Sequence, residues 1–227
     1  MSVRTWRMLG AGALLAVSAQ AAAQNRMAGS GIRVTKDNAT VSSTASVTPS
    51  NPTITTNLVG GEVSLATPFD LSAYGNVSEP NIAAHLLSGD SLEIQQAQLA
   101  QTKAMDPRVR DYATTLFNDH SAHLASTLTL IAKEHVGSTP MLNDPESLRM
   151  REFLTQMRNT GGGTNWDAAF LRFQAAHHQH EIDILNAVIK SAHDDDFEDH
   201  IDDTLKALAK HRDMARSLAT TLGVSLP

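Results

Sequence analysis

Four stretches of the chain repeat apolar side chains at the i, i+3, i+4 spacing of a helix with one buried face. A fifth, shorter stretch with the same spacing lies between the second and the third of them. The pattern predicts four long helices and one short helix, over residues 78–104, 106–137, 144–159, 164–192 and 194–223.

Local sequence signals mark where these helices should begin. Ser78, Asp106 and Asp144 are each followed within two positions by proline, the usual order of a cap residue and a first helical turn. Thr164 with Asp167 three residues later resembles a capping box. We therefore expect a helix start at each of these four places.

The ends and the connections of the helices indicate how they pack. Gly137 and Gly223 are expected to close the second and the last helix. Long helices joined by short loops favour an antiparallel four-helix bundle. The short helix over 144–159 lengthens the middle connection, which is a ferritin-like feature. The fold prediction is an all-α, ferritin-like antiparallel four-helix bundle with one extra short helix.

The N-terminus has the order of an export signal. Arg4 and Arg7 precede an apolar run over residues 8–17, and small residues at 21–23 offer a cleavage site. About ten apolar residues are too few to cross a bilayer, so we do not expect a membrane anchor. Residues 1–23 are predicted to be a signal peptide, which places the mature protein in the periplasm or outside the cell without a transmembrane span.

The segment over residues 24–77 is rich in Ser, Thr, Asn and Gly and shows no sustained helical period. It has too few large apolar side chains to offset the entropy of ordering a chain. We therefore predict a disordered, flexible tether, with the bundle occupying residues 78–227.

Composition narrows the function mainly by exclusion. The net charge of −6 gives no basic surface for nucleic acid, and with no cysteine there is no disulfide, thiolate nucleophile or Cys-ligated zinc. No nucleophile elbow, phosphate-binding loop or dinucleotide fingerprint occurs. The sequence favours a non-enzymatic protein, and leaves a protein partner or a homo-oligomer open.

One ligand-class residue interrupts the apolar face of each long helix near its midpoint. These residues are Glu93, His120, His178 and His211. Helices of matched length in a bundle bring their midpoints to one level, so we expect the four side chains to converge. A carboxylate and three imidazoles in a buried layer could bind Fe, Zn, Mn, Cu or Ni.

Neighbouring polar residues could complete such a site. His123 follows His120, and Glu181 follows His178, by one helical turn, so each pair projects to the same side. Asp119 and His177 could accept or donate the hydrogen bonds that orient metal ligands.

A structural interpretation accounts for the same residues. Glu93 could accept hydrogen bonds from the imidazoles in a buried layer that serves only to fix helix register. Since successive helical positions point in different directions, we also expect His177 and His180 to be solvated. The acidic cluster over residues 193–203 is expected to be a solvated helix start.

Four segments resemble the DUF4142 family, exported ferritin-like bundle proteins of unestablished activity. They are "GDSLEIQQAQLAQ", "VRDYATTLFNDHSAHLA", "WDAAFLRFQAAHHQHEIDIL" and "LKALAKHRDMARSLA", one on each long helix. The resemblance covers roughly residues 80–222 and implies the same fold. It matches the four midpoint residues to recurring polar positions of the family, although His177 stands where the family often has Asp.

The resemblance does not imply iron oxidation. The chain lacks the two Glu-x-x-His pairs that hold the di-iron centre of true ferritins. Two function classes follow from the sequence. One is a protein that binds or buffers a transition metal through Glu93, His120, His178 and His211. The other is a non-catalytic envelope or stress-related interaction module whose polar layer is structural.

Overall fold

The computed structural model describes residues 61–226 of the chain. These residues are all-α: they form five α-helices and two 3-10 helices, and no strand. The elements are η2 (Leu71–Tyr74), α1 (Glu79–Lys103), α2 (Pro107–Lys133), α3 (Pro145–Asn159), α4 (Thr164–Val188), η3 (Ile189–Ser191) and α5 (Asp195–Thr221). The predicted number, order and type of helices are confirmed.

Three of the predicted helix starts are made as expected. Ser78 forms a capping box with Asn81, while Asp106 and Asp144 each accept a backbone N–H of the first turn. The fourth start is different. Gly163, not Thr164, is the N-cap of α4, and no side-chain hydrogen bond caps this helix start.

The carboxylate of Asp167 contacts the turn between α1 and α2 and does not cap its own helix. Asp167 accepts the backbone N–H groups of Met105 and Asp106, at 2.9 and 2.8 Å, and so fixes the turn between α1 and α2.

The second helix, α2, ends at Lys133, four residues before Gly137, where the sequence predicted its end. His135 takes the left-handed conformation after it, with φ of 54°. Gly223, with φ of 68°, follows α5 as predicted.

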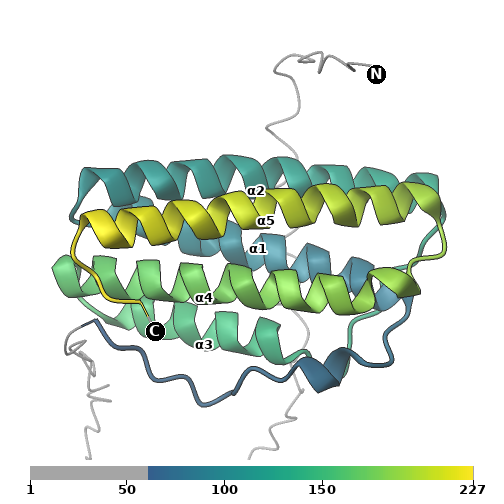
Figure 1. Ribbon diagram of the computed structural model, residues 1–227, viewed down its shortest axis with the longest axis horizontal. Coiled ribbons are helices and arrows are strands. Elements are labelled where there is room, and N and C mark those ends of the chain that lie inside the picture. The colour runs from purple at the N-terminus through teal and green to yellow at the C-terminus, as the bar shows by residue number, and fades with distance from the viewer. Residues whose placement is uncertain (1–60, 227) are drawn as a thin grey trace, which may run out of the picture. The chain divides into compact units, whose positions relative to one another are not determined.

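The four long helices form a closed bundle. Contacts join α1 to α2, α2 to α5, α5 to α4 and α4 to α1. Helices linked by the short turns run in opposite directions, and α3 returns the chain so that α2 and α4 point the same way (Figure 1). α3 packs outside this bundle against α1 and α4. The ferritin-like comparison, which rests on this crossover, stays a prediction.

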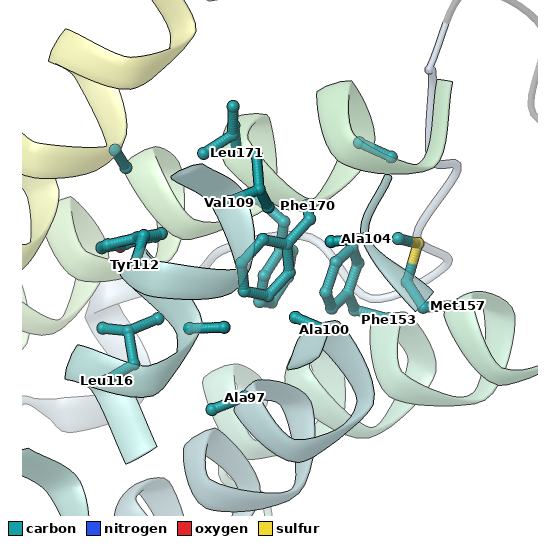
Figure 2. Packing of buried hydrophobic residues seen from close by; sticks show 14 of the residues in the cluster. Ala97, Ala100, Ala104, Val109, Tyr112, Leu116, Phe153, Met157, Phe170 and Leu171 are labelled. Carbon is teal, nitrogen blue, oxygen red and sulfur yellow. The ribbon is translucent and has the colours of Figure 1, made fainter. Parts of the chain in front are cut away.

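Two apolar clusters fill the bundle, one toward each end. In the first, Tyr112 and Phe170 meet edge to face with ring centroids 6.1 Å apart, and Ala97 and Ala100 of α1 are fully buried beside them (Figure 2). Small side chains at these positions let helices approach closely, and each buried aromatic contributes roughly 2–3 kcal/mol of apolar burial.

The second cluster contains residues from the opposite halves of the same helices, including Ile82, Leu185 and Ile201. The middle turns of α1, α2, α4 and α5 lie between the two clusters in the sequence of each helix. The apolar ends hold the helices in register, so the polar residues of the middle turns meet at one level.

Residues 61–77 pack against the helices, although the sequence pattern predicts that they belong to the flexible tether. Glu152 of α3 accepts the backbone N–H groups of Ala66 and Thr67 at 2.8 and 3.1 Å. Tyr74 is 3% exposed, and its hydroxyl donates to Asp144 at 2.7 Å. The packed domain therefore begins before the predicted boundary at residue 78. Phe69 also stacks on His180 with ring centroids 3.9 Å apart, and Val63 and Leu65 pack against the first apolar cluster. These contacts are irregularly spaced in the sequence, so periodicity does not reveal them.

The predicted signal peptide, 1–23, and most of the predicted tether lie outside the described residues. Within residues 61–226, no helix is both long enough and apolar enough to span a membrane.

Candidate metal centre

Three histidines from three helices meet in the middle of the bundle. His120 comes from α2, His178 from α4 and His211 from α5. Their ring centroids are 5.9 Å (His120–His178), 5.1 Å (His120–His211) and 5.3 Å (His178–His211) apart. Each of the three residues is at most 7% exposed, and one nitrogen from each lies within 4.8 Å of the others. The common level predicted from the helix midpoints is confirmed for these three residues.

The opposite nitrogen of each ring is anchored by an acceptor. Nδ1 of His120 donates to Asp90 Oδ1 at 2.9 Å, and Nε2 of His211 donates to Asp119 Oδ2 at 2.9 Å. Nδ1 of His178 donates to the carbonyl oxygen of Gln174 at 2.8 Å. Because these oxygens can only accept, each bond places a proton on the outer nitrogen, and in the neutral ring the inner nitrogen then has a lone pair.

The three inner nitrogens are buried, and none has a hydrogen-bond partner among residues 61–226. They are Nε2 of His120, Nε2 of His178 and Nδ1 of His211. A buried polar atom left without a partner costs about 1–3 kcal/mol. Three such atoms facing one another would be expensive in a layer that existed only for its hydrogen bonds. A cation at their centre would satisfy all three.

The distances suit a small metal ion after a slight inward movement. Metal–nitrogen bonds of about 2.1 Å place two ligand nitrogens at most about 4.2 Å apart. The observed limit of 4.8 Å is close to this value.

Electrostatics keep two of the three imidazoles neutral. Burial, together with the neighbouring histidines, lowers the pKa of His178 well below its ordinary value. Burial and His120 lower the pKa of His211 to about 4, against the opposing effect of Asp119. For His120, burial lowers the pKa, but the hydrogen bond to Asp90 and the charge of Glu93 outweigh it and raise the pKa.

Glu93, the fourth predicted ligand, is buried beside the histidines but is not part of the three-nitrogen group. Its Oε1 accepts from Gln174 Nε2 at 3.2 Å and lies 3.4 Å from His177 Nε2. Its Oε2 has no hydrogen-bond partner in the described part of the chain. Gln174 also donates to Gln96 Oε1 at 3.0 Å, so the carboxylate belongs to a polar chain next to the histidines.

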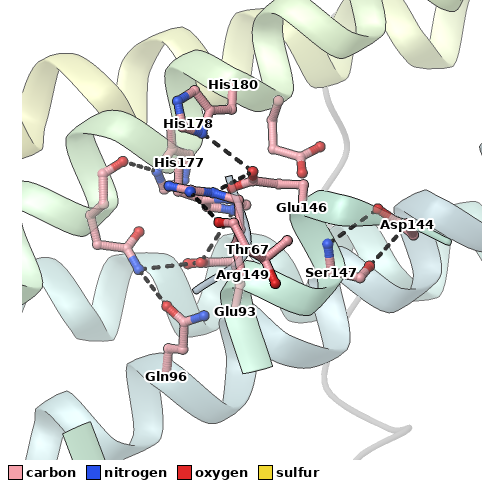
Figure 3. Close-up of polar contacts among 12 residues, drawn as sticks. Thr67, Glu93, Gln96, Asp144, Glu146, Ser147, Arg149, His177, His178 and His180 are labelled. Carbon is pink, nitrogen blue, oxygen red and sulfur yellow. Dashed lines mark hydrogen bonds and ion pairs between the residues drawn. The ribbon is translucent and has the colours of Figure 1, made fainter. Parts of the chain in front are cut away.

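His177 is buried, at 2% exposure, and the expectation that it is solvated is wrong. Its Nδ1 donates to Glu146 Oε1 at 2.8 Å, and its Nε2 faces Glu93 (Figure 3). Burial lowers the pKa of His177, but Glu146 and Glu93 raise it to about 9. His180 is only partly exposed and lies 3.3 Å from Glu146. The short helix α3 supplies Glu146 and so covers this side of α4.

The predicted auxiliary residues Asp119, His123 and Glu181 form hydrogen bonds with different partners. Asp119 accepts a hydrogen bond from one of the candidate ligands, His211, and not from its neighbour His120. His123 uses both ring nitrogens in hydrogen bonds, to Asp90 at 2.8 Å and to Thr204 at 2.7 Å. Glu181 accepts from His85 Nε2 at 2.9 Å and keeps its Oε1 without a partner within residues 61–226.

Four further residues of this polar layer were not predicted from the sequence: Asp90, His85, Asp144 and Glu146. Asp90 lies one turn before Glu93 and binds both His120 and His123, so the same i, i+3 rule could have found it. His85 lies between Asp144 (2.8 Å) and Glu181 (2.9 Å). The sequence marks Asp144 only as a helix cap, and nothing in its pattern indicates that Glu146 is buried.

A cavity of about 50 Å³ adjoins two of the three histidines. His120 and His211 form part of its wall, together with the carboxylate residues Asp90, Glu93, Asp119 and Glu181. Such a space exceeds the roughly 10–15 Å³ that one water requires. The centre therefore has three nitrogen donors on one side and room for a small molecule on the other.

Comparison with known proteins gives one match. A family model described as "Domain of unknown function (DUF4142)" matches residues 66–218. The match begins within the segment held by Glu152, in agreement with the packed domain starting before residue 78. No curated protein and no solved structure matches the chain significantly.

Proposed function

The chain belongs to the DUF4142 family, and we propose that its helical domain binds one transition-metal ion through His120, His178 and His211. The observation that carries the proposal is the set of three buried imidazole nitrogens that face one another without hydrogen-bond partners among the described residues. The anchored outer nitrogens support it, because metal-binding histidines almost always donate their other N–H to a carboxylate or a carbonyl oxygen.

The donor set favours a borderline metal. Three imidazole ligands, each neutral once bound to the metal, suit Zn²⁺, Cu²⁺, Ni²⁺ or Fe²⁺, whereas Mn²⁺ prefers oxygen donors. Within the usual order of stability, Cu²⁺ binds most tightly to such a site. Asp90 and Asp119 lie behind two of the ligands and supply negative charge that balances the cation.

We also propose that the protein binds its metal after export from the cytoplasm. The sequence of residues 1–23 supports export, so the site would encounter metal ions in the periplasm or outside the cell. Fractionation of cells that produce the full chain, with detection of the protein by mass, tests this part. Recovery of the uncleaved chain from the cytoplasm would contradict it.

Metal titration of protein purified without a His tag tests the site. We expect one Zn²⁺ or Cu²⁺ per chain by calorimetry and metal analysis. His120→Gln and His211→Gln should each weaken binding by more than about 100-fold, beyond the loss caused by changing only an orienting partner. His193→Gln is the matched control, because His193 is exposed and contributes no side chain to the centre.

The result separates the proposal from a purely structural layer. Helical content measured by circular dichroism should stay the same in all variants, so that lost binding is not lost folding. A wild-type chain that takes up no Zn²⁺, Cu²⁺ or Ni²⁺ at neutral pH would overturn the proposal and favour the structural layer.

A further inference from the structure

A glycine forms part of the wall of the cavity beside the histidines. Gly89 of α1 lines the cavity, and a Cβ added at this residue would meet no atom within 4 Å. Glycine inside a helix costs about 1 kcal/mol relative to alanine, so its place here is not explained by helix stability. Gly89 and His123 are partly exposed, and both line the same cavity, so small molecules can reach it from solvent.

Two carboxylate oxygens without partners belong to residues of the cavity wall. Oε2 of Glu93 and Oε1 of Glu181 are buried and have no hydrogen-bond partner within residues 61–226. Both can only accept hydrogen bonds. Asp90 and Asp119 add further negative charge to the wall. These surroundings repel anions and favour a neutral molecule that donates an O–H.

We propose that this cavity holds a small neutral protic ligand, of the size of water or hydrogen peroxide, which occupies an open position on the metal and donates a hydrogen bond to Glu93. The inference rests on the proposed function, since the three histidines must first hold the metal. Three protein ligands and one open position are the arrangement of metal sites that accept a ligand from solvent. Glu93 is then an acceptor for this ligand and not a metal ligand itself.

Water relaxation of the Cu²⁺-loaded protein tests the occupancy of the cavity. Exchange of a copper-bound water with bulk solvent should raise the proton relaxation rate of water in the wild-type sample. Gly89→Leu places a side chain in the cavity and should remove most of this increase while one Cu²⁺ per chain is retained. Gly89→Ala is the matched variant, and should retain most of the increase.

Three outcomes are distinguishable. Loss of the relaxation increase in Gly89→Leu at full copper occupancy supports the inference. An equal increase in wild type and Gly89→Leu, or no increase in wild type with copper bound, overturns it and leaves the metal site standing. Absence of copper from wild type overturns both proposals.

A second variant tests the role of Glu93 without filling the cavity. Glu93→Gln removes a negative charge beside the open position, and should tighten azide binding to the Cu²⁺-loaded protein on the order of tenfold. Glu198→Gln, which changes an exposed acid of α5, should leave azide affinity unchanged. Unchanged or weaker azide binding in Glu93→Gln would contradict the placement of this carboxylate at the ligand position.

Discussion

Asp90 accepts a hydrogen bond from Nδ1 of His120 at 2.9 Å, and this bond fixes which nitrogen of the ring faces His178 and His211. The same carboxylate accepts from Nδ1 of His123 at 2.8 Å. Burial raises the pKa of Asp90, but the two imidazoles outweigh it and lower the pKa. Asp90 is therefore a charged, buried group that orients one of the proposed ligands.

Asp90→Asn should weaken metal binding by about 10–100-fold, since the amide no longer fixes the tautomer or raises the basicity of His120. Calorimetric titration with Zn²⁺ measures the change. Asp111→Asn, an exposed position on α2, is the control and should bind as wild type does. Equal affinities in the two variants would show that Asp90 does not act on the metal through His120.

Gly89→Ala should stabilise the protein by about 0.5–1 kcal/mol, because the new methyl group meets open space and the helix loses a flexible residue. The midpoint temperature of thermal unfolding should then rise by about 1–4 °C for a domain of this size. Gly162→Ala is the opposite case: its Cβ would lie 2.6 Å from the carbonyl oxygen of Lys103, so its midpoint should fall. A lower midpoint in Gly89→Ala would contradict the open space next to this residue, because it would mean that the new methyl group clashes with a neighbour.

The ion pairs of His85 should make stability depend on pH. Burial lowers the pKa of His85, but Glu181 and Asp144 raise it well above its ordinary value of 6.5. Burial raises the pKa of Asp144, but His85 and its other partners lower it below 3.8. The contribution of His85 is complete below pH 6.5 and is lost as the pH rises through its raised pKa. That of Asp144 is complete above pH 3.8 and is lost on acidification.

The stabilisation by this pair is therefore greatest between about pH 4 and 6.5. His85→Gln should lower the free energy of unfolding at pH 5.5 by about 3 kcal/mol, because the buried carboxylate of Glu181 and the partly buried carboxylate of Asp144 lose their partner. The loss should become smaller as the pH is raised toward 10. Urea unfolding of wild type and variant at a series of pH values measures it, with the exposed His193→Gln as control. A pH-independent difference would contradict the charged state of His85.

Glu152→Ala should release the segment before η2 from α3. The amides of Ala66 and Thr67 donate to its carboxylate, so their hydrogen exchange should quicken by at least about tenfold when the acceptor is removed. Glu152→Gln keeps one acceptor oxygen and should show a smaller effect. Exchange read by mass spectrometry on peptides covering residues 61–70 makes the comparison. Unchanged exchange in Glu152→Ala would show that the segment is held by other contacts.

The sequence by itself determined the helices and the level of the site. Apolar residues at helical spacing and caps such as Asp106 defined five helices, because both signals are local and repeat along the chain. The midpoint rule placed His120, His178 and His211 together, since apolar clusters on either side of them fix the helix register. Local signals failed where another segment competes: Asp167 serves the turn before α2 instead of its own helix.

Only the tertiary structure decided which atom of each side chain faces the centre. Glu93 and His177 lie in the same layer as the histidines, yet Glu146 of α3 draws His177 toward it, and His177 with Gln174 holds one oxygen of Glu93. Asp90 and Asp119 fix the outer nitrogens of His120 and His211. These partners are 30 to 92 residues apart in the chain. Periodicity assigns a residue to a face of one helix, but hydrogen bonds between helices depend on how those faces meet.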